Sequence, residues 1–469
     1  MAAEYVNNSP PSSQSLARRA DHADNVPVIR VSLATEPISI DRRFRLDSAG
    51  SSPWARWSYQ LASPSVLVQA DATGHTVASS ASGMIAAWPD PLAALRWMQQ
   101  QLVEPPQEGP PFKGGWLGYL GYDLGRWFEV LPARRIEPSV PLMAFAFFDE
   151  LLATDHHTGR IYHVRLSHGL PTQRLQPLDE PWPISSADSA AAGLPRSNFA
   201  SRKVYEAAVA RAIEYIAAGD IFQVNLSQRF SLPLTRPPAE VYDRLRHEFG
   251  AWFGGYLEWP RVALLCNSPE LFLRVRCDND GRRHVLTRPI KGTRPRGPGM
   301  EEALRRSPKD QAELNMIIDL ERNDLGRICR TGSVQVTEPR VIEAHPTVYH
   351  GAATIEGQLE PAVGLVELLA ATFPGGSITG APKIRAMQII DELEPTARGP
   401  YCGAIGFFSA DGTVDLNIAI RTMIAAGGQV HVPVGGGIVA DSLPAEEYEE
   451  TLVKASALFG ALRAAGCTR

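Results

Sequence analysis

Hydrophobic and polar positions alternate in several short stretches of the amino-terminal third of the chain. The stretches VPVIRVSLA and SVLVQADATGHTVAS combine β-branched residues with flanking turn residues, which is typical of strands. The stretch LLATDHHTGRIYHVRLS has the same character on both sides of Thr158 and Gly159, so it predicts a hairpin. His156 and His157 then fall in its turn, and no third metal ligand lies near them in sequence.

The stretch IFQVNLSQRF, residues 221–230, shows a clear period of two. Side chains two positions apart share one face of a strand. The pattern therefore predicts one face packed in the core and one polar face that could line a site. The core face holds Phe222, Val224, Leu226 and Phe230, and the polar face holds Gln223, Asn225, Ser227 and Arg229.

Helical periodicity occurs in three longer stretches. In SRKVYEAAVARAIEYIAAGD the apolar residues recur every three or four positions, and Gly219 ends the predicted helix. Ser307, Pro308 and Asp310 together form a helix start signal, and Gly326 supplies an end. A third helix is predicted over residues 444–465. Strands and helices do not strictly alternate, so the pattern favours an α+β fold over a doubly wound sheet.

Length and composition suggest more than one structural portion. The 469 residues, with 44% hydrophobic content and nine tryptophans, can bury one large core or two. Residues 1–27 are predicted to form a disordered tail, and the Pro-, Ser- and Ala-rich segment 174–200 is predicted to be a linker. We therefore expect an amino-terminal α+β portion over 28–173 and a carboxy-terminal portion over 201–466.

The charge balance is mildly acidic, with 46 Lys and Arg against 51 Asp and Glu and a formal net charge of −5. This balance offers no broad basic surface for nucleic acid or an acidic membrane, so a bound anion must meet a local cluster. No run approaches the roughly 18 apolar residues of a membrane span. Five cysteines without a CxxC pair argue against a disulfide framework or a zinc ribbon, and a cytoplasmic location fits best.

The segment RPIKGTRPRG, residues 288–297, surrounds one lysine with positive charge. Lys291 lies between a rigid Pro-Ile pair and a glycine, and Arg288, Arg294 and Arg296 crowd the same loop. Neighbouring cations favour a neutral amine, which could attack as a nucleophile while the arginines attract an anionic substrate. The alternative is a basic loop on a solvated face.

Two glycine-rich segments allow the backbone to approach a ligand. FPGGSITGAPKIRAMQIIDEL lacks the Gly-Lys-Ser/Thr ending of a nucleoside triphosphate loop, so we reject that function. Its turn precedes a helix whose N-terminal amides could hold a carboxylate. VGGGIVADS, with Gly435 to Gly437, offers a second close approach.

Two pairs of acidic residues lie three positions apart on predicted helices. Asp310 and Glu313 share one helix face, and Glu447 and Glu450 share another. If the two faces met, their oxygens would suit Mg²⁺ completed by waters and an anionic substrate. The alternative is that Asp310 belongs to the helix cap and Glu450 pairs with a lysine four residues later on the surface.

Taken together, these segments resemble the chorismate-utilising enzymes. The shared motifs occur in the family's order over roughly residues 200–460, and GGWLGYLGYDL resembles the family's amino-terminal portion. They are AGDIFQVNLSQRF, SPELF, RPIKGTRPRG, MIIDLERNDLGR, FPGGSITGAPKIRAMQIIDELEP, YCGAIGF, IRT and GGGIVADS. The resemblance implies an α+β fold with large antiparallel β-sheets packed as a sandwich and helices outside, like anthranilate synthase component I. It also implies that residues 201–466 form the chorismate-binding catalytic portion.

The motif PIKGT, with its lysine, resembles the same motif in the family members that replace the ring hydroxyl of chorismate with an amino group. Their product is 4-amino-4-deoxychorismate, on the path to p-aminobenzoate and folate, whereas anthranilate-forming members usually have alanine at this position. The resemblance implies that Lys291 adds to the ring as the hydroxyl leaves and that ammonia then displaces the lysine. Glu270 of SPELF would act as general acid and base, and His350 would lie beside the ring.

The resemblance also assigns ligands for a magnesium ion and for the substrate. Glu313 and Glu450 would hold Mg²⁺, with Asp310 and Glu447 acting directly or through water, and the metal would bind the ring carboxylate. Arg421 of IRT would clamp the enolpyruvyl carboxylate. The remaining substrate contacts would come from Tyr401, Gly436, Lys454 and Ser377.

Gln223 stands where water-adding relatives such as isochorismate and salicylate synthases have a lysine, so water is disfavoured as the nucleophile. The chain lacks a Gly-x-Cys-x-Gly elbow and a glutaminase-like segment. We expect ammonia to come from a separate glutaminase subunit, and a separate pyridoxal-phosphate lyase to remove the enolpyruvyl group later.

Two other functions are compatible with the same motifs. One is anthranilate synthesis, which aminates the other ring position and eliminates pyruvate, and the other is a non-catalytic subunit that binds a small acid. In the amino-terminal portion, SSPWARWSY could line a ligand pocket, since relatives can hold tryptophan there. We favour packing of Trp54 and Trp57 in an aromatic core.

Overall fold

The computed structural model describes residues 28–49, 52–102, 108–131, 137, 139–176, 181–185, 195–345 and 348–468. Two twelve-stranded antiparallel sheets are formed by these residues. Sheet A contains, in spatial order, β1 (Val28–Leu33), β10 (Ile161–Ser167), β9 (Glu150–Asp155), β3 (Trp57–Leu61), β2 (Phe44–Asp47), β13 (Phe253–Trp259), β14 (Val262–Ser268), β23 (Thr422–Ala426), β24 (Gln429–Ile438), β12 (Gln223–Pro233) and β11 (Arg196–Ser197), with β20 (Gly380–Ala381) also paired to β12.

Sheet B, like sheet A, combines strands from the amino-terminal and the carboxy-terminal parts of the chain. Its order is β17 (Ile290–Pro295), β19 (Val348–Gln358), β16 (Arg283–Arg288), β15 (Leu271–Cys277), β22 (Val414–Ile418), β21 (Ala404–Ser409), β7 (Gly115–Leu120), β8 (Met143–Phe148), β4 (Val66–Ala70), β5 (Thr76–Ser80) and β6 (Gly83–Trp88), with β18 (Gln335–Ala344) also paired to β19.

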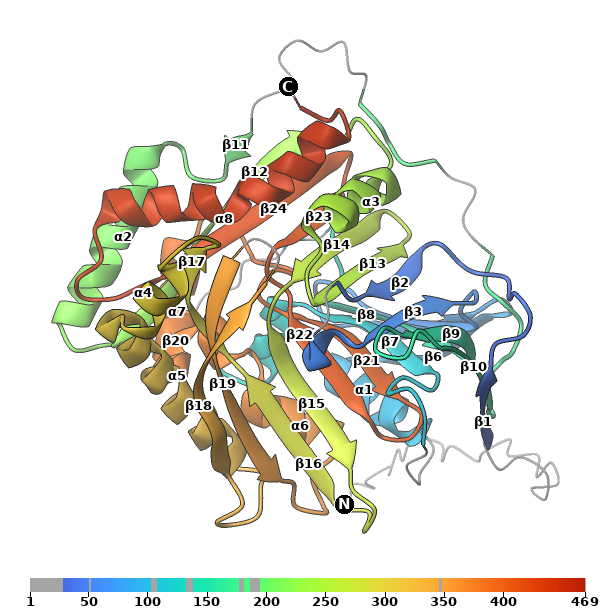
Figure 1. Ribbon diagram of the computed structural model, residues 1–469. Coiled ribbons are helices and arrows are strands. Elements are labelled where there is room, and N and C mark those ends of the chain that lie inside the picture. The colour runs from blue at the N-terminus through green and yellow to red at the C-terminus, as the bar shows by residue number, and fades with distance from the viewer. Residues whose placement is uncertain are drawn as a thin grey trace, which may run out of the picture.

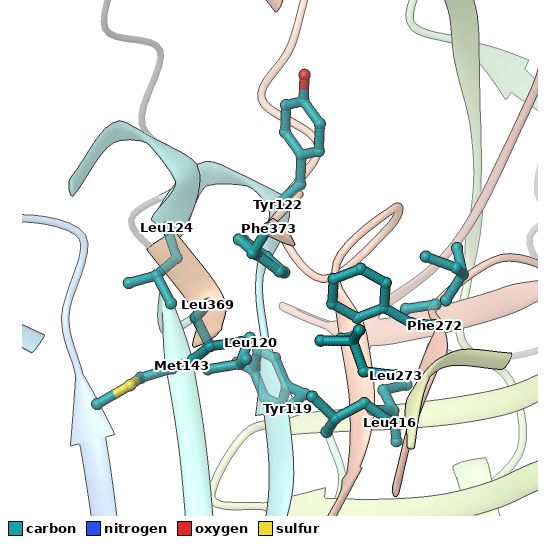
Figure 2. Close-up of a cluster of buried hydrophobic side chains, with 14 of the residues drawn as sticks. Tyr119, Leu120, Tyr122, Leu124, Met143, Phe272, Leu273, Leu369, Phe373 and Leu416 are labelled. Atoms are coloured by element: carbon teal, nitrogen blue, oxygen red, sulfur yellow. The ribbon is translucent and has the colours of Figure 1, made fainter. Parts of the chain in front are cut away.

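The hydrophobic core lies between the two sheets. Phe44 of sheet A packs edge-on against Phe148 of sheet B, with ring centroids 5.2 Å apart, and Tyr119 meets Trp259 in the same way at 5.1 Å. Figure 2 shows one region of this core, where buried side chains from β7, β8, β15, β22 and α6 converge. Every residue of β7 and β8 is buried, so these central strands of sheet B are covered on both faces, and the apolar area removed from water favours folding.

The helices lie outside the sandwich. In Figure 1, α8 and α3 cover strands of sheet A, and α5 lies along the β17–β19 end of sheet B. The helices are α1 (Pro91–Gln100), α2 (Arg202–Ala217), α3 (Pro238–Phe249), α4 (Met300–Arg305), α5 (Pro308–Gly326), α6 (Leu365–Thr372), α7 (Lys383–Leu393) and α8 (Pro444–Ala464), with short 3₁₀ turns η1 (Pro53–Ala55), η2 (Tyr122–Trp127) and η3 (Gly376–Ile378). The observed layers confirm the predicted α+β sandwich.

Local signals placed several of the elements that the sequence predicted. Ser307 caps α5 by accepting a hydrogen bond from the Asp310 amide, and α5 ends at Gly326, as predicted. The hairpin around Thr158 is formed by β9 and β10. The prediction for Phe222 is wrong: the strand begins one residue later, and this ring is 71% exposed. Periodicity alone could not show where the edge of the core falls.

The predicted division into portions remains a prediction, and the proposed tail, 1–27, lies outside the described residues. Both sheets combine strands from before and after the segment 174–200; for example, β2 pairs with β13 and β7 pairs with β21. The five cysteines all lie in the described ranges, and none of them forms a disulfide there. No helix in the described ranges is long and apolar enough to cross a membrane.

Replacing Phe148 by alanine should lower the free energy of unfolding by about 3–5 kcal/mol, because the ring is fully buried between the sheets and its loss leaves a cavity. Chemical denaturation measures this change. The exposed Phe222 provides a matched control, and its replacement by alanine should change the unfolding free energy by less than about 0.5 kcal/mol. Equal losses in the two variants would contradict the described core.

Candidate active site

The predicted site residues come from both sheets and from the helices that cover them. Lys291 is on β17 and His350 is on β19, both in sheet B, whereas Gln223 and Gly436 are on β12 and β24 of sheet A. The helices α5 and α8 contribute the acidic residues. The fold thus brings β17 and β19 of sheet B near β12 and β24 of sheet A, around one cluster of polar groups.

Ser377 connects the two groups predicted to carry the chemistry. Its hydroxyl donates a hydrogen bond of 2.5 Å to Glu270 Oε1, and its main-chain oxygen accepts one of 3.4 Å from Lys291 Nζ. Glu270 follows β14, where its amide donates to Ser268 Oγ at 3.2 Å. The amine of β17 and the carboxyl of the β14–β15 connection therefore contact the same residue.

Glu270 is buried, with 4% of its surface exposed. Burial raises the pKa of Glu270 to about 7, although the Ser377 hydroxyl and the charge of Lys291 oppose this rise. A carboxyl group with this pKa is present in both protonation states near neutral pH. It can therefore give a proton to a leaving group and take one back.

Lys291 has the lowered pKa that the sequence suggested, but the cause is different. Burial is the largest effect on the pKa of Lys291, and the charge of Lys454 adds to it, while Glu313 and Glu270 oppose it. The neighbouring arginines have other partners: Arg288 binds Glu343 at 2.6 Å and Arg294 binds Asp310 at 2.8 Å. Arg288 and Arg294 are thus neutralised locally.

The backbone after Lys291 requires a glycine. The register of β17 against β19 shifts between Lys291 and Thr293, and Gly292 has a φ of 81°. A Cβ at Gly292 would lie 2.7 Å from Leu304 Cδ1 and 2.8 Å from Asp310 Cγ. The bulge is possible only because the residue has no side chain, and it directs Lys291 toward the η3 turn.

His350 is buried, and its surroundings favour the neutral imidazole. Burial lowers the pKa of His350 well below its usual value, and the charges of His345 and Arg421 act in the same direction. Its Nδ1 lies 2.9 Å from Thr293 Oγ1, so the ring is fixed by the residue two positions after Lys291. A neutral histidine can hydrogen-bond to a substrate without adding charge.

A second group of predicted substrate contacts consists of Arg421, Tyr401 and Lys454. Arg421 has a φ of 51° and donates from Nη1 to the Lys454 main-chain oxygen at 2.7 Å. Burial lowers the pKa of Arg421, whereas the charge of Tyr401 raises it. Lys454 Nζ donates to Gly435 O at 2.9 Å and pairs with Glu450 at 2.5 Å. The remaining guanidinium donors of a partly buried arginine suit a carboxylate.

Gln223 is fully buried at the start of β12, and neither its Oε1 nor its Nε2 has a hydrogen-bond partner among the described residues. A Cβ at Gly437 would lie 3.1 Å from Gln223 Nε2. An unpaired buried amide is costly, so a ligand that supplied a donor or an acceptor here would recover that cost. The predicted position of Gln223 in the substrate site stays a prediction.

The acidic residues approach one another from two helices. Carboxylate oxygens of Glu447 and Glu450 lie 3.3 and 3.4 Å from the position of a Cβ on Gly436. Burial raises the pKa of Glu313 and of Glu447, and repulsion by Glu450 adds to both effects. Within the described ranges, no three such side chains are close enough to form a preformed metal cluster. Their donor chemistry nevertheless fits Mg²⁺, because this ion binds carboxylate and water oxygens.

Both alternatives to metal binding are also present in the contacts. Asp310 pairs with Arg294 at the start of α5, so this acid already has a cation partner. Glu450 pairs with Lys454 at i,i+4, and that pairing outweighs burial and lowers the pKa of Glu450. Of the four predicted acids, Glu313 and Glu447 therefore have the greatest need for a cation.

Comparison with known proteins identifies the family. Residues 57–460 match the family described as chorismate binding enzyme. This chain is a member of that family. Anthranilate synthase component 1 of Thermus thermophilus is 42% identical over 392 residues, which cover 80% of this chain and 83% of the relative. Aminodeoxychorismate synthase component 1 of Escherichia coli is 40% identical over 418 residues, covering 87% and 90%.

The fold of this chorismate binding enzyme also has a solved counterpart. The crystal structure of anthranilate synthase component I from Streptococcus pneumoniae is 31% identical, with a TM-score of 0.72, and the match covers 87% of this chain and 93% of that chain. Both enzyme classes match at nearly equal identity. The comparisons therefore establish a chorismate-utilising enzyme, and the choice of product depends on the residues of the site.

Some residues of the site have no role in the sequence analysis. Thr293 orients His350, and Asn225 donates to the Ser377 main-chain oxygen at 3.1 Å. Asn225 was placed on a polar strand face, and that face was the available signal. Its partner is 152 positions away in sequence, so the contact itself could not be predicted.

The tryptophans of SSPWARWSY lie at a separate cavity. Trp54 and Trp57 line a space of about 250 Å³ between the sheets, instead of filling a fully packed aromatic core. Trp57 also packs against core residues, so the prediction holds in part for this ring. Trp54 lies under the Arg288 guanidinium at 4.3 Å from the ring centroid. A cation–π contact of this kind keeps the ring at the cavity wall.

Proposed function

We propose that this chain is aminodeoxychorismate synthase component I, which acts in the cytoplasm and converts chorismate and ammonia to 4-amino-4-deoxychorismate. The observation that carries the proposal is that Ser377 contacts both the partly buried Lys291 amine and the buried Glu270 carboxyl. Burial lowers the pKa of Lys291 and raises the pKa of Glu270 to about 7. An amine that is readily neutral is needed for nucleophilic attack at neutral pH. The product leads to p-aminobenzoate and folate.

The reaction would proceed in two substitutions. Lys291 Nζ forms a bond to the ring carbon as the carbon–oxygen bond breaks, and Glu270 gives its proton to the departing hydroxyl, which leaves as water. The Glu270 carboxylate then accepts the proton that the new secondary amine loses. Ammonia next attacks the same carbon, and the bond to Lys291 breaks as Glu270 returns its proton to the lysine nitrogen. The ammonium group formed on the product then gives a proton to the Glu270 carboxylate. Two easier steps replace one difficult displacement.

The other residues would bind and orient chorismate. Arg421 donates to the enolpyruvyl carboxylate, beside Tyr401 and Lys454, and its second guanidinium edge stays fixed by the Lys454 carbonyl. His350 donates a hydrogen bond to the ring face as neutral imidazole. Gln223 and Gly436 border the ring, and the uncharged Gln223 is too weak a base to activate water.

Glu313, Glu447 and Glu450 would hold Mg²⁺, and Asp310 would act through water because Arg294 already binds it. When bound, the cation supplies charge that neutralises the ring carboxylate and anchors the substrate. Ammonia would come from a separate glutaminase subunit, component II. A separate lyase would then act on the product.

Removal of Mg²⁺ by a chelator should abolish chorismate turnover, and added Mg²⁺ should restore it. Glu313→Gln should raise the Mg²⁺ concentration for half-maximal turnover at least about tenfold, because a carboxylate ligand is lost. Manganese binding, followed by electron paramagnetic resonance, gives a second measurement without turnover. Asp441→Asn is a suitable control, because the side chain of this acid is 70% exposed and lies near α5, the helix that carries Glu313. Full activity in chelator would exclude the metal role.

The proposal is tested by incubating the protein with chorismate, Mg²⁺ and ammonium and identifying the product by mass spectrometry. Aminodeoxychorismate is expected, with its enolpyruvyl group retained. Fluorescent anthranilate formed without a lyase would assign the alternative, anthranilate synthase component I, which the 42% identity to the Thermus relative also supports. A chain that consumes no chorismate would be the non-catalytic subunit.

A further inference from the structure

Ser377 fixes the distance between the two groups of the proposed reaction. Its main chain contacts Lys291 and its hydroxyl contacts Glu270. A small displacement of this residue would move both groups relative to the ring. Reactions that depend on such alignment lose rate steeply when a group moves by about 1 Å. The contacts that hold Ser377 are therefore part of the catalytic geometry.

Asn225 of β12 holds Ser377 directly. Its Nδ2 donates to the Ser377 main-chain oxygen at 3.1 Å, and its own amide donates to Thr379 O at 2.8 Å. A carbonyl oxygen has two lone pairs, so the Ser377 oxygen can accept from Asn225 and Lys291 together. The bond from Asn225 is shorter than the 3.4 Å contact from Lys291. The asparagine therefore sets the direction of the carbonyl, and the lysine follows it.

The main chain around this contact is held by a buried arginine. Arg398 donates to Asn225 O at 2.8 Å and to Ile378 O at 3.0 Å, so it connects β12 to the η3 turn. Arg398 is in turn paired with Glu394 at 2.6 Å, and Glu394 accepts from the Ser227 amide at 2.8 Å. With the backbone held on both sides, the Asn225 side chain is the element that orients Ser377.

We propose that Asn225 is a positioning residue for the reaction: its amide holds Ser377, and through Ser377 it holds Lys291 and Glu270 at the reacting carbon. The inference rests on the proposed function, in which these two groups perform the substitution. Asn225 itself acts through Ser377 and takes no proton.

The electrostatics of Glu270 give this role a measurable signature. Lys291 and Lys454 face Glu270 with positive charge, and Glu321 lies across the turn, with its Cγ 3.4 Å from the position of a Cβ on Gly376. The Ser377 hydroxyl lowers the pKa of Glu270 against the effect of burial. Loss of that hydroxyl contact therefore raises the pKa of Glu270, and the alkaline limb of kcat/KM moves to higher pH.

The test replaces Asn225 by leucine, which keeps the shape and removes the donor, and by alanine in case the leucine variant is unstable. We expect kcat to fall about tenfold and KM to stay within about twofold. The alkaline limb of the kcat/KM profile should move to higher pH. Asn198→Leu is the matched control: this asparagine loses comparable hydrogen bonds, to Thr396 and to the Arg229 amide, outside the site. The control should lower the melting temperature without moving the pH profile.

A double variant shows whether Asn225 acts through Ser377. Ser377→Ala removes the hydroxyl contact to Glu270, so it should raise the alkaline limb by itself. The double variant with Asn225→Leu and Ser377→Ala should then have its alkaline limb at the same pH as Ser377→Ala alone, because the same contact cannot be lost twice. Additive shifts in the double variant would contradict the inference.

Crystal structures of the leucine and alanine variants decide the question without activity. The expected result is that the Ser377 contact to Glu270 opens beyond 3.5 Å. If the contacts of Ser377 to Lys291 and Glu270 both persist, the inference is overturned, whatever the wild-type enzyme produces. If the wild-type protein consumes no chorismate, the proposed function fails while these distances still test the role of Asn225 in the geometry.

Discussion

Replacing Lys291 by alanine is expected to abolish aminodeoxychorismate formation, with a loss in kcat on the order of a thousandfold or more. The amine is the atom that bonds to the ring, and a methyl group cannot take its place. Binding of chorismate should persist, because the proposed carboxylate contacts come from Arg421 and the metal site. Product formation is followed by mass spectrometry, and chorismate binding is followed by calorimetry.

Two further lysine variants separate attack from charge. Lys291→Arg keeps a cation on a long side chain but cannot supply a neutral amine, so it should be as inactive as the alanine variant. Lys203→Ala removes an exposed lysine of α2 and should retain nearly full activity. Activity above about a tenth of wild type in Lys291→Ala would exclude covalent catalysis by this residue.

Glu270→Gln is expected to lower kcat by about 10²- to 10⁴-fold, because the neutral amide has the shape of the acid and cannot give a proton to the leaving hydroxyl. The variant should also lose the titration near pH 7, at which wild-type Glu270 changes its protonation state. The measurement is kcat/KM against pH for both proteins. An unchanged profile would assign the alkaline limb to a different group.

The same substitution should affect stability in a way that depends on pH. Burial raises the pKa of Glu270 from 4.5 to about 7 in the folded protein. The stabilisation from the bound proton is complete below the pKa of the unfolded chain and is lost as the pH rises through the folded value. Relative to wild type, Glu270→Gln should therefore gain about 3 kcal/mol of unfolding free energy between pH 4 and pH 8. Denaturant titrations at both pH values measure this difference.

The candidate site shows which features a linear sequence can carry. The start of α5 at Ser307 and Pro308 depends on residues within one helical turn, so local capping rules found it. The acids of α5 and α8 were placed on their helix faces by spacing alone. The resemblance to chorismate-utilising enzymes, which depends on the order of several motifs, indicated the family that the comparison later established.

Other features required the folded chain. The low pKa of Lys291 was predicted, but the sequence attributed it to adjacent arginines, and their partners Glu343 and Asp310 belong to other elements. Phe222 fitted the period of the core face but lies beyond the edge of the strand. Trp54 carries an apolar ring, yet its position at a cavity wall depends on how the two sheets meet.

By itself, the sequence determined where a few elements begin or end, that the fold is α+β, and which family the chain resembles. Those properties depend on residues close together along the chain or on motifs read in order. Only the tertiary structure decided how each polar group is charged and what it contacts. Burial and hydrogen bonding are set by elements brought together from distant positions, such as Lys291, Ser377 and Glu270, and no local pattern records their separation in space.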